Sequence, residues 1–357
     1  MNLLYKINVV SRVIKSIFLK QKPNYAIIYI DGRCNMHCGF CIHAAVDARK
    51  TPIMNADQWG QIFRNAKSLI HLTITGGEPF LRKDFVEILD NILKKNKIPQ
   101  VSINTNGFYI DRIKKFIPEL IEKHKNTEFT LSISLDGPEE IHDKVRVFKG
   151  AYQKALETID EIKYLREKPN FFLKLASVLT KDNKYFMEDF LNQTSKWSID
   201  FHELILVRDV PVKDQLAVKD EFLKLKKMQH ERTSKIWKKS FNGKLFKKLY
   251  KETIKKIDNE KIFSPCLAGG RLIEIFPDGV VRGCEVEKLW DVSKIGNLNS
   301  SNNDIVEMIK TKEAKKFREI AKKCTCTFEC ASAVNTVYEP KPVSYTHLTL
   351  PTTDRGL

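Results

Sequence analysis

The amino-acid sequence predicts an α/β protein: a partial (β/α)6 barrel followed by a small cysteine-rich unit built from a β-hairpin and helices. Apolar, β-branched runs alternate with amphipathic helical patterns throughout residues 24–208. This alternation indicates βαβ units around a parallel sheet. Polar residues and glycines follow the first four apolar runs, at the carboxyl ends of the expected strands. Five of the eight cysteines come after residue 260 and mark a second unit.

Six segments rich in Val, Ile, Phe and Thr have the length of strands. They are Tyr25 to Ile30, Leu72 to Thr75, Val101 to Asn104, Phe129 to Leu135, Phe171 to Leu179 and Phe201 to Val207. Apolar residues recur at helical spacing between them. The expected helices run from about Ala56 to Leu69, Lys83 to Lys94, Asp111 to Lys123, Ala151 to Glu167 and Lys184 to Lys196. Six such units make a barrel that is open on one side.

Length and composition fit a folded protein with more than one core. The chain has 357 residues, of which 42% are hydrophobic, and a formal net charge of +17. This length favours a large unit plus a smaller one. We find no cleavable signal pattern and no run of about 18 apolar residues, which argues against a membrane span. Eight cysteines in such a chain indicate the reducing cytoplasm, where spaced cysteines bind metal rather than form disulfides.

The most informative motif is a CxxxCxxC run that directly follows the first strand. It contains Cys34, Cys38 and Cys41. Iron–sulfur clusters are held by cysteine thiolates, and such a cluster normally takes four ligands. Three clustered cysteines therefore leave one iron open for a substrate or cofactor. A zinc site is the alternative, because thiolates also bind zinc.

Two further features accompany the cysteines. Phe40 stands directly before the third cysteine, and Thr75-Gly76-Gly77-Glu78-Pro79 ends the second strand. Together with the CxxxCxxC run, these motifs resemble those of the radical S-adenosylmethionine (SAM) family. The resemblance implies a [4Fe–4S] cluster whose open iron is chelated by the amino and carboxylate groups of SAM. It also implies reductive cleavage of SAM to a 5′-deoxyadenosyl radical, which abstracts a hydrogen atom from the substrate.

The resemblance also implies cofactor-binding positions. They are Phe40, Gly76, Gly77, Glu78, Pro79, Asn106, Ser134 and Arg146. The two glycines let the backbone approach a ligand closely, and Glu78 offers an acceptor for the cofactor's ammonium. The guanidinium of Arg146 matches a carboxylate. Simpler interpretations stay open, since Asn-Gly and Asp-Gly are common turn pairs and Arg146 fits a solvated helix start.

The cysteines of the second unit form a separate set. It consists of Cys266, Cys284, Cys324, Cys326 and Cys330. The segment from Leu272 to Val281, with Pro277-Asp278-Gly279 as its turn, predicts a hairpin that brings the first two thiols together at its base. The pattern resembles the SPASM and twitch auxiliary-cluster subgroup, although with fewer cysteines than a two-cluster domain needs.

One auxiliary [4Fe–4S] cluster is therefore expected, and because five thiols compete for four positions, either Cys324 or Cys326 is surplus or a ligand exchanges. A four-cysteine zinc site is the alternative.

We expect five regions in the chain. They are an amphipathic N-terminal helix at 1–22, the barrel at 23–210, a basic helical connector at 211–263, the auxiliary unit at 264–340 and a non-native tail at 341–357. The N-terminal helix suits weak contact with an anionic membrane surface or a place against the barrel, and we favour the second. The tail resembles translated adapter sequence, so we leave it out of the fold prediction and expect the natural C-terminus to be missing.

The connector contains fifteen lysines and one arginine against seven acidic residues within residues 211–262. Such charge attracts an acidic peptide, a phosphorylated substrate or an anionic surface. A solvated lysine-rich face is the simpler interpretation. No nucleic-acid-binding motif accompanies it.

The resemblance thus predicts a cytoplasmic radical SAM enzyme of the oxidoreductase or maturase type that acts in peptide or protein maturation. Its partners would be a peptide or small-molecule substrate and an electron donor such as ferredoxin or flavodoxin. Dehydrogenation or another modification of a sugar, lipid or cofactor precursor is the second hypothesis. An iron–sulfur electron-transfer or binding protein without radical chemistry is the third.

Overall fold

The computed structural model describes residues 11–12, 15–16, 22–41, 53–208, 212–237, 265–286, 289–298, 304–324 and 328–338. Most of the expected N-terminal helix, the second half of the connector, Cys326 and the tail lie outside the described residues. The described strands form one nine-stranded sheet in the order β6-β5-β4-β3-β2-β1-β7-β8-β9. None of the described helices has both the length and the apolar character needed to cross a bilayer.

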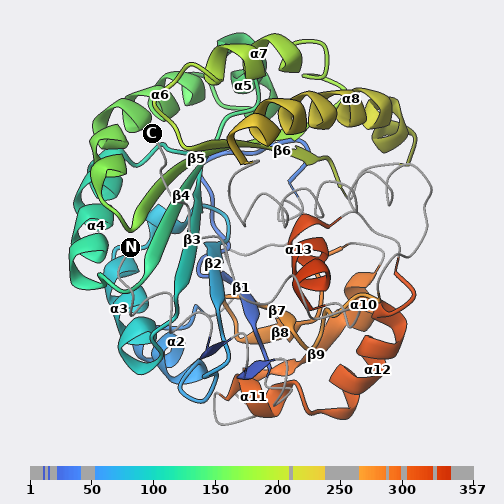
Figure 1. The fold of residues 1–357 in the computed structure, drawn as a ribbon. Coiled ribbons are helices and arrows are strands. Elements are labelled where there is room, and N and C mark those ends of the chain that lie inside the picture. Colours follow the sequence, from blue (N-terminus) through green and yellow to red (C-terminus); the bar gives the residue numbers. More distant parts are fainter. Residues whose placement is uncertain are drawn as a thin grey trace.

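The six predicted strands are confirmed and pair in parallel in chain order. They are β1 (Tyr25–Tyr29), β2 (His71–Thr75), β3 (Gln100–Thr105), β4 (Glu128–Ser134), β5 (Phe171–Leu179) and β6 (Phe201–Leu206). Helices cover the outer side of the curved sheet (Figure 1). They are α2 (Ala56–Ile62), α3 (Phe85–Lys95), α4 (Ile110–Lys123), α5 (Glu139–Arg146), α6 (Ala151–Ile162), α7 (Met187–Thr194) and α8 (Val212–Trp237). The mostly parallel α/β architecture is therefore confirmed.

Side-chain alternation explains which face of the sheet carries the core. In β5, Leu173, Leu175 and Leu179 are buried, while Lys174, Ala176 and Val178 are only half-buried. Successive side chains of a strand point to opposite faces. One face of the strand therefore packs into the core, and the other carries mostly partly exposed side chains.

Helix α2 is shorter than the pattern predicts. It begins with a capping box at Asn55 and ends at Ile62, where a longer helix was expected. The chain then turns, and the amide of Asn96, at the end of α3, donates to the carbonyls of Phe63 and Ala66. The side chain of Asn96, 30 residues or more away in the sequence, thus donates to carbonyls that have no donor within the helix.

The predicted C-terminal hairpin is present as β7 (Leu272–Ile275) and β8 (Val280–Arg282). It does not form a sheet of its own. β7 pairs in parallel with β1, and β8 and β9 (Lys294–Asn297) extend the same sheet in antiparallel fashion. Four helices accompany it. They are α10 (Trp290–Ser293), α11 (Ile305–Met308), α12 (Lys312–Ala321) and α13 (Glu329–Tyr338).

Helix α13 lies at the side of the sheet that the outer helices leave uncovered (Figure 1). The Tyr25 hydroxyl of β1 donates to Cys330 Sγ in α13 at 3.4 Å. At the other end of the six-stranded part, the Leu206 N–H of β6 donates to Glu329 Oε1 at 3.4 Å. The first residues of α13 therefore contact both the first and the sixth strand.

Candidate functional site

The loops after β1 and β2 are joined backbone to backbone. Gly77 N donates to the Asp31 carbonyl at 2.7 Å, and Glu78 N donates to the Arg33 carbonyl at 2.9 Å. A Cβ atom at Gly77 would lie 2.0 Å from the Arg33 oxygen, and Gly76 has φ +143°. Close packing against the cysteine loop therefore requires glycine at both positions. The sequence alone instead suggests that a ligand approaches the two glycines closely.

The three cysteines of this loop are free thiols. Cys38 is buried, while Cys34 and Cys41 are half-buried around it. Burial raises the pKa of Cys34 to about 11 and also raises that of Cys38. Among the described residues, no three His, Cys, Asp or Glu side chains gather closely enough to hold a single metal ion.

Hydrogen-bond donors point at two of these sulfurs. The Met36 N–H donates to Cys34 Sγ at 3.4 Å, and the Asn106 amide approaches the same sulfur at 3.9 Å. Arg146 Nη1 donates to Cys38 Sγ at 3.6 Å. Such donors favour the thiolate, which is the form that binds iron, and so oppose the rise in thiol pKa that burial causes.

Glu78 is a buried acceptor, 1% exposed, beneath the cysteine loop. Its Oε1 accepts from Phe80 N at 3.1 Å and from Thr105 Oγ1 at 2.8 Å. Its Oε2 accepts from Asn106 N at 2.8 Å. Burial raises the pKa of Glu78 to about 7 against the effect of these donors. The carboxylate thus also fixes the end of β3, a role that the sequence did not reveal.

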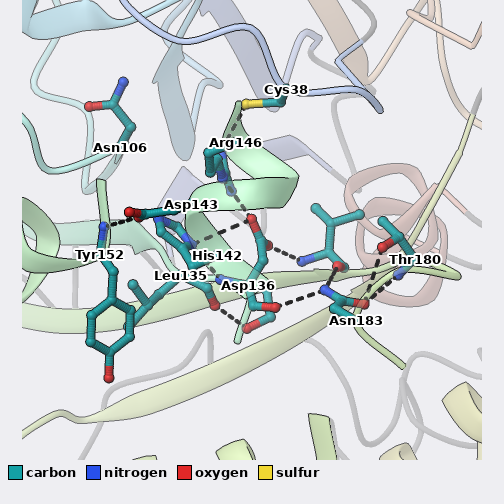
Figure 2. A network of polar contacts seen from close by, with 12 residues as sticks. Cys38, Asn106, Leu135, Asp136, His142, Asp143, Arg146, Tyr152, Thr180 and Asn183 are labelled. Carbon is teal, nitrogen blue, oxygen red and sulfur yellow. Dashed lines mark hydrogen bonds and ion pairs between the residues drawn. The ribbon is translucent and has the colours of Figure 1, made fainter. Parts of the chain in front are cut away.

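A polar network connects Cys38 to α5 and β5 (Figure 2). Asp136 is fully buried and accepts from Arg146 Nε at 2.6 Å and from Val178 N at 2.8 Å. Its own N–H donates to His142 Nδ1 at 3.0 Å. Burial lowers the pKa of His142 to about 4, so the ring is neutral at pH 7 and its proton is on Nε2.

Arg146 is thus 8% exposed rather than solvated, and its carboxylate partner in the structure is Asp136. Asp136 was not among the predicted site residues. Its signals were the Asp-Gly pair after the fourth strand and the arginine ten positions later.

The remaining predicted positions lie at or just after the carboxyl ends of β1, β2 and β4. Phe40 is half-buried, with the Arg146 guanidinium carbon 5.4 Å from its ring centre. It lines a cavity of about 270 Å³ together with α5 and the turn after β5. Pro79 is buried and begins a short 3-10 helix, η2 (Pro79–Leu81). Ser134 ends β4 and is half-buried.

The four described C-terminal cysteines lie before β7, after β8, after α12 and in α13. Cys266 and Cys284 are buried and interact electrostatically, and burial raises the pKa of Cys284 well above its usual range. Cys330 lies in α13 beside Tyr25, and burial raises its pKa to about 12. Cys324 is half-buried just after α12.

A buried acidic cluster near the hairpin was also not predicted. Arg208 Nη2 donates to Glu285 Oε1 at 2.8 Å, and the Tyr29 hydroxyl donates to the other oxygen of Glu285. Glu274 is fully buried, and neither carboxylate oxygen has a hydrogen-bond partner among the described residues. Burial, and then the charge of Glu285, raises the pKa of Glu274. The sequence signals were an acidic residue inside an apolar strand and another next to Cys284.

Comparison with protein families finds a match for the part of the chain from β1 to α6. Residues 28–167 match the model of the Radical SAM superfamily. This segment is similar to radical SAM superfamily domains. All the predicted cofactor positions and the first three cysteines fall within the matched range. The following cysteine, Cys266, lies far beyond it, which leaves three thiols for a cluster in this domain.

Sequence relatives of the radical SAM domain include GTP 3′,8-cyclase of Clostridium botulinum, which is 28% identical over 52% of this chain. The match spans only 57% of that relative's length. An uncharacterized protein of Methanocaldococcus jannaschii is 27% identical over 81% of this chain and 93% of its own length.

Two solved structures have a fold similar to that of this chain. Native anSMEcpe with bound AdoMet aligns with a TM-score of 0.63 at 18% identity, over 91% of this chain and 93% of that one. Streptococcus suis SuiB bound to the precursor peptide SuiA aligns with a TM-score of 0.59 at 18% identity, over 88% of this chain and 70% of that one. At these identities the likeness establishes the fold.

The residues present fit the [4Fe–4S] cluster and SAM that this family implies. Three free thiols lie on one loop, and N–H donors point at two of the sulfurs. Glu78 lies beneath this loop, and a cavity opens beside Phe40. The site therefore offers thiolate ligands, a buried carboxylate, and a cavity lined by Gly39 and Phe40 of the cysteine loop.

Proposed function

We propose that this chain is a radical SAM enzyme whose cluster is held by Cys34, Cys38 and Cys41. The observation that carries the proposal is the thiol set with its N–H donors, next to a buried carboxylate and a cavity. When bound, the cluster and SAM supply the 5′-deoxyadenosyl radical that abstracts a hydrogen atom from the substrate.

The chain's own residues bind and orient the cofactor in this proposal. The Glu78 carboxylate accepts a hydrogen bond from the cofactor's ammonium in addition to its three present hydrogen bonds. The ring of Phe40 borders the cavity that receives the cofactor. Arg146 uses Nε and Nη1 for Asp136 and Cys38. Its Nη2 makes no hydrogen bond to the described residues and is free for the cofactor's carboxylate. Asn106 and Ser134 border the same mouth from β3 and β4.

Peptide or protein maturation is the substrate class that we propose first. Support comes from solved structures with the same fold, of which SuiB is bound to its precursor peptide and anSMEcpe to a Kp18Cys peptide. A nucleotide substrate is the second candidate, because several sequence relatives are GTP 3′,8-cyclases. We further propose a cytoplasmic location, ferredoxin or flavodoxin as electron donor, and one auxiliary cluster at the C-terminal cysteines.

The proposed function is tested by cleavage of SAM. Anaerobically reconstituted, dithionite-reduced protein should form 5′-deoxyadenosine and methionine slowly without substrate. Cys38→Ala should abolish the products, because that thiolate is a cluster ligand. Product formation by the variant that lacks Cys34, Cys38 and Cys41 would refute the assignment. Faster 5′-deoxyadenosine formation on addition of GTP would favour the nucleotide candidate over the peptide.

A further inference from the structure

The sulfurs of the cysteine loop differ in their hydrogen-bond donors. Cys38 Sγ receives the cationic Nη1 of Arg146 at 3.6 Å. Cys34 Sγ receives neutral donors, the Met36 N–H and the Asn106 amide. Arg146 and Cys38 are each 8% exposed. A charge in such a place is poorly screened by water, so it acts on the neighbouring sulfur, and the paired carboxylate of Asp136 offsets only part of this effect.

The orientation of Arg146 is fixed from two sides. Asp136 Oδ2 accepts from its Nε at 2.6 Å, and the ring of Phe40 lies against the guanidinium. Asp136 is held in turn by Val178 N and by Asn183, whose amide donates to the Asp136 carbonyl at 2.8 Å (Figure 2). The guanidinium therefore stays directed at Cys38 without help from a ligand.

We propose that Arg146 raises the reduction potential of the cluster held by Cys34, Cys38 and Cys41. Asp136 is the positioning residue, because it holds the guanidinium in place. The proposal rests on the function proposed above. A reduced cluster carries one more negative charge than an oxidised one. A cation and an N–H···S bond at one of its sulfurs therefore stabilise the reduced state, and hydrogen bonds to sulfur are among the factors that set cluster potentials.

The test is an EPR-monitored redox titration of reconstituted protein without substrate or SAM. The signal that later addition of SAM perturbs identifies the cluster of the loop. Arg146→Met should make the potential more negative. At a fixed applied potential, the ratio of reduced to oxidised cluster should fall about tenfold, which is about 59 mV for one electron. Arg146→Lys keeps the charge without the planar fork and should recover part of the loss.

Arg33→Met is the matched control. Arg33 precedes Cys34, its side chain is 50% exposed, and its guanidinium pairs with Asp31 at 2.7 Å. Solvent screens such a charge. The Arg33→Met potential should therefore stay at the wild-type value.

An Arg146→Met protein with full iron content and the wild-type potential would overturn the proposal. An equal shift in Arg33→Met would overturn it as well. If Arg146→Met fails to retain the cluster, Arg146→Lys decides, since a lowered potential supports the proposal and an unchanged one refutes it. Absence of iron at the three cysteines of the wild type would instead count against the proposed function.

Discussion

Replacing Glu78 with glutamine tests the proposed contact with the cofactor. The carboxylate already has three donors, from Phe80, Thr105 and Asn106, and lies under the cysteine loop. A charge-assisted hydrogen bond to the cofactor's ammonium contributes roughly 1.5 to 3 kcal/mol. Because 1.4 kcal/mol corresponds to about one decade in affinity, Glu78→Gln should weaken SAM binding by about ten- to a hundredfold. Equilibrium binding at pH 8, where Glu78 is ionised, measures the effect.

Glu78→Gln should also change how the stability of the fold depends on pH. Burial raises the pKa of Glu78 from 4.5 to about 7 in the folded chain, and the hydrogen bonds from Asn106, Phe80 and Thr105 oppose this rise only in part. A group whose pKa is higher in the folded state stabilises the fold fully at low pH. That contribution is lost as pH rises from about 4.5 through about 7. The shift corresponds to about 3 kcal/mol.

Denaturant unfolding of iron-free protein at pH 5 and pH 8 tests this linkage. Wild type should lose stability between the two values by more than Glu78→Gln does, because glutamine does not titrate. Glu87→Gln, on the exposed face of α3, is the matched control for both assays. Unchanged SAM affinity in Glu78→Gln, with full iron content, would move the ammonium contact to another residue. An identical pH dependence in the variant would show that Glu78 is not the buried titrating group.

Two other predictions concern iron content and loop packing. Reconstituted wild type should carry about eight irons per chain, and replacing Cys34, Cys38 and Cys41 with alanine should remove about half. About four irons with stoichiometric zinc would exclude the auxiliary cluster. Gly77→Ala should lower iron loading, because its Cβ would lie 2.0 Å from the Arg33 oxygen, whereas Gly39→Ala in the same loop meets no atom within 4 Å. Equal iron loading in the two glycine variants would contradict this account of the loop.

Elements with strong local patterns could be predicted from the sequence. The bounds of β5 match the expected Phe171 to Leu179, because its alternating side chains mark both ends. The early end of α2 could not be predicted, since it depends on the amide of Asn96 from another helix. The hairpin was predicted as a local structure, but its place beside β1 depends on pairing between residues about 250 positions apart.

In the candidate site, too, local features could be predicted from the sequence and long-range contacts could not. The cysteine loop and the Gly-Gly-Glu segment are each contiguous in the chain, so their chemistry could be predicted from the order of residues alone. The clamp on Arg146 combines Asp136 with Val178, which lies 42 positions further along the chain. The bond between Tyr29 and Glu285 spans 256 positions. Contacts of this kind leave no periodic pattern, which is why both clusters were missed.

The sheet topology also places the two cysteine sets relative to each other. β7 runs parallel to β1, so its carboxyl end and the cysteine loop lie at the same edge of the sheet. β8 runs back, which carries Cys284 to the other edge, where Tyr25 at the start of β1 contacts Cys330. Five residues of β1 separate these edges, and at about 3.3 Å per residue the two edges are roughly 16 Å apart.

A group held at the C-terminal cysteines would therefore be too far from the loop to share a ligand with it. Tyr29 is the last residue of β1, and its hydroxyl donates to Glu285, which also pairs with Arg208. The arrangement supports separate roles for the two cysteine sets, with radical chemistry at one edge of the sheet and any auxiliary iron at the other.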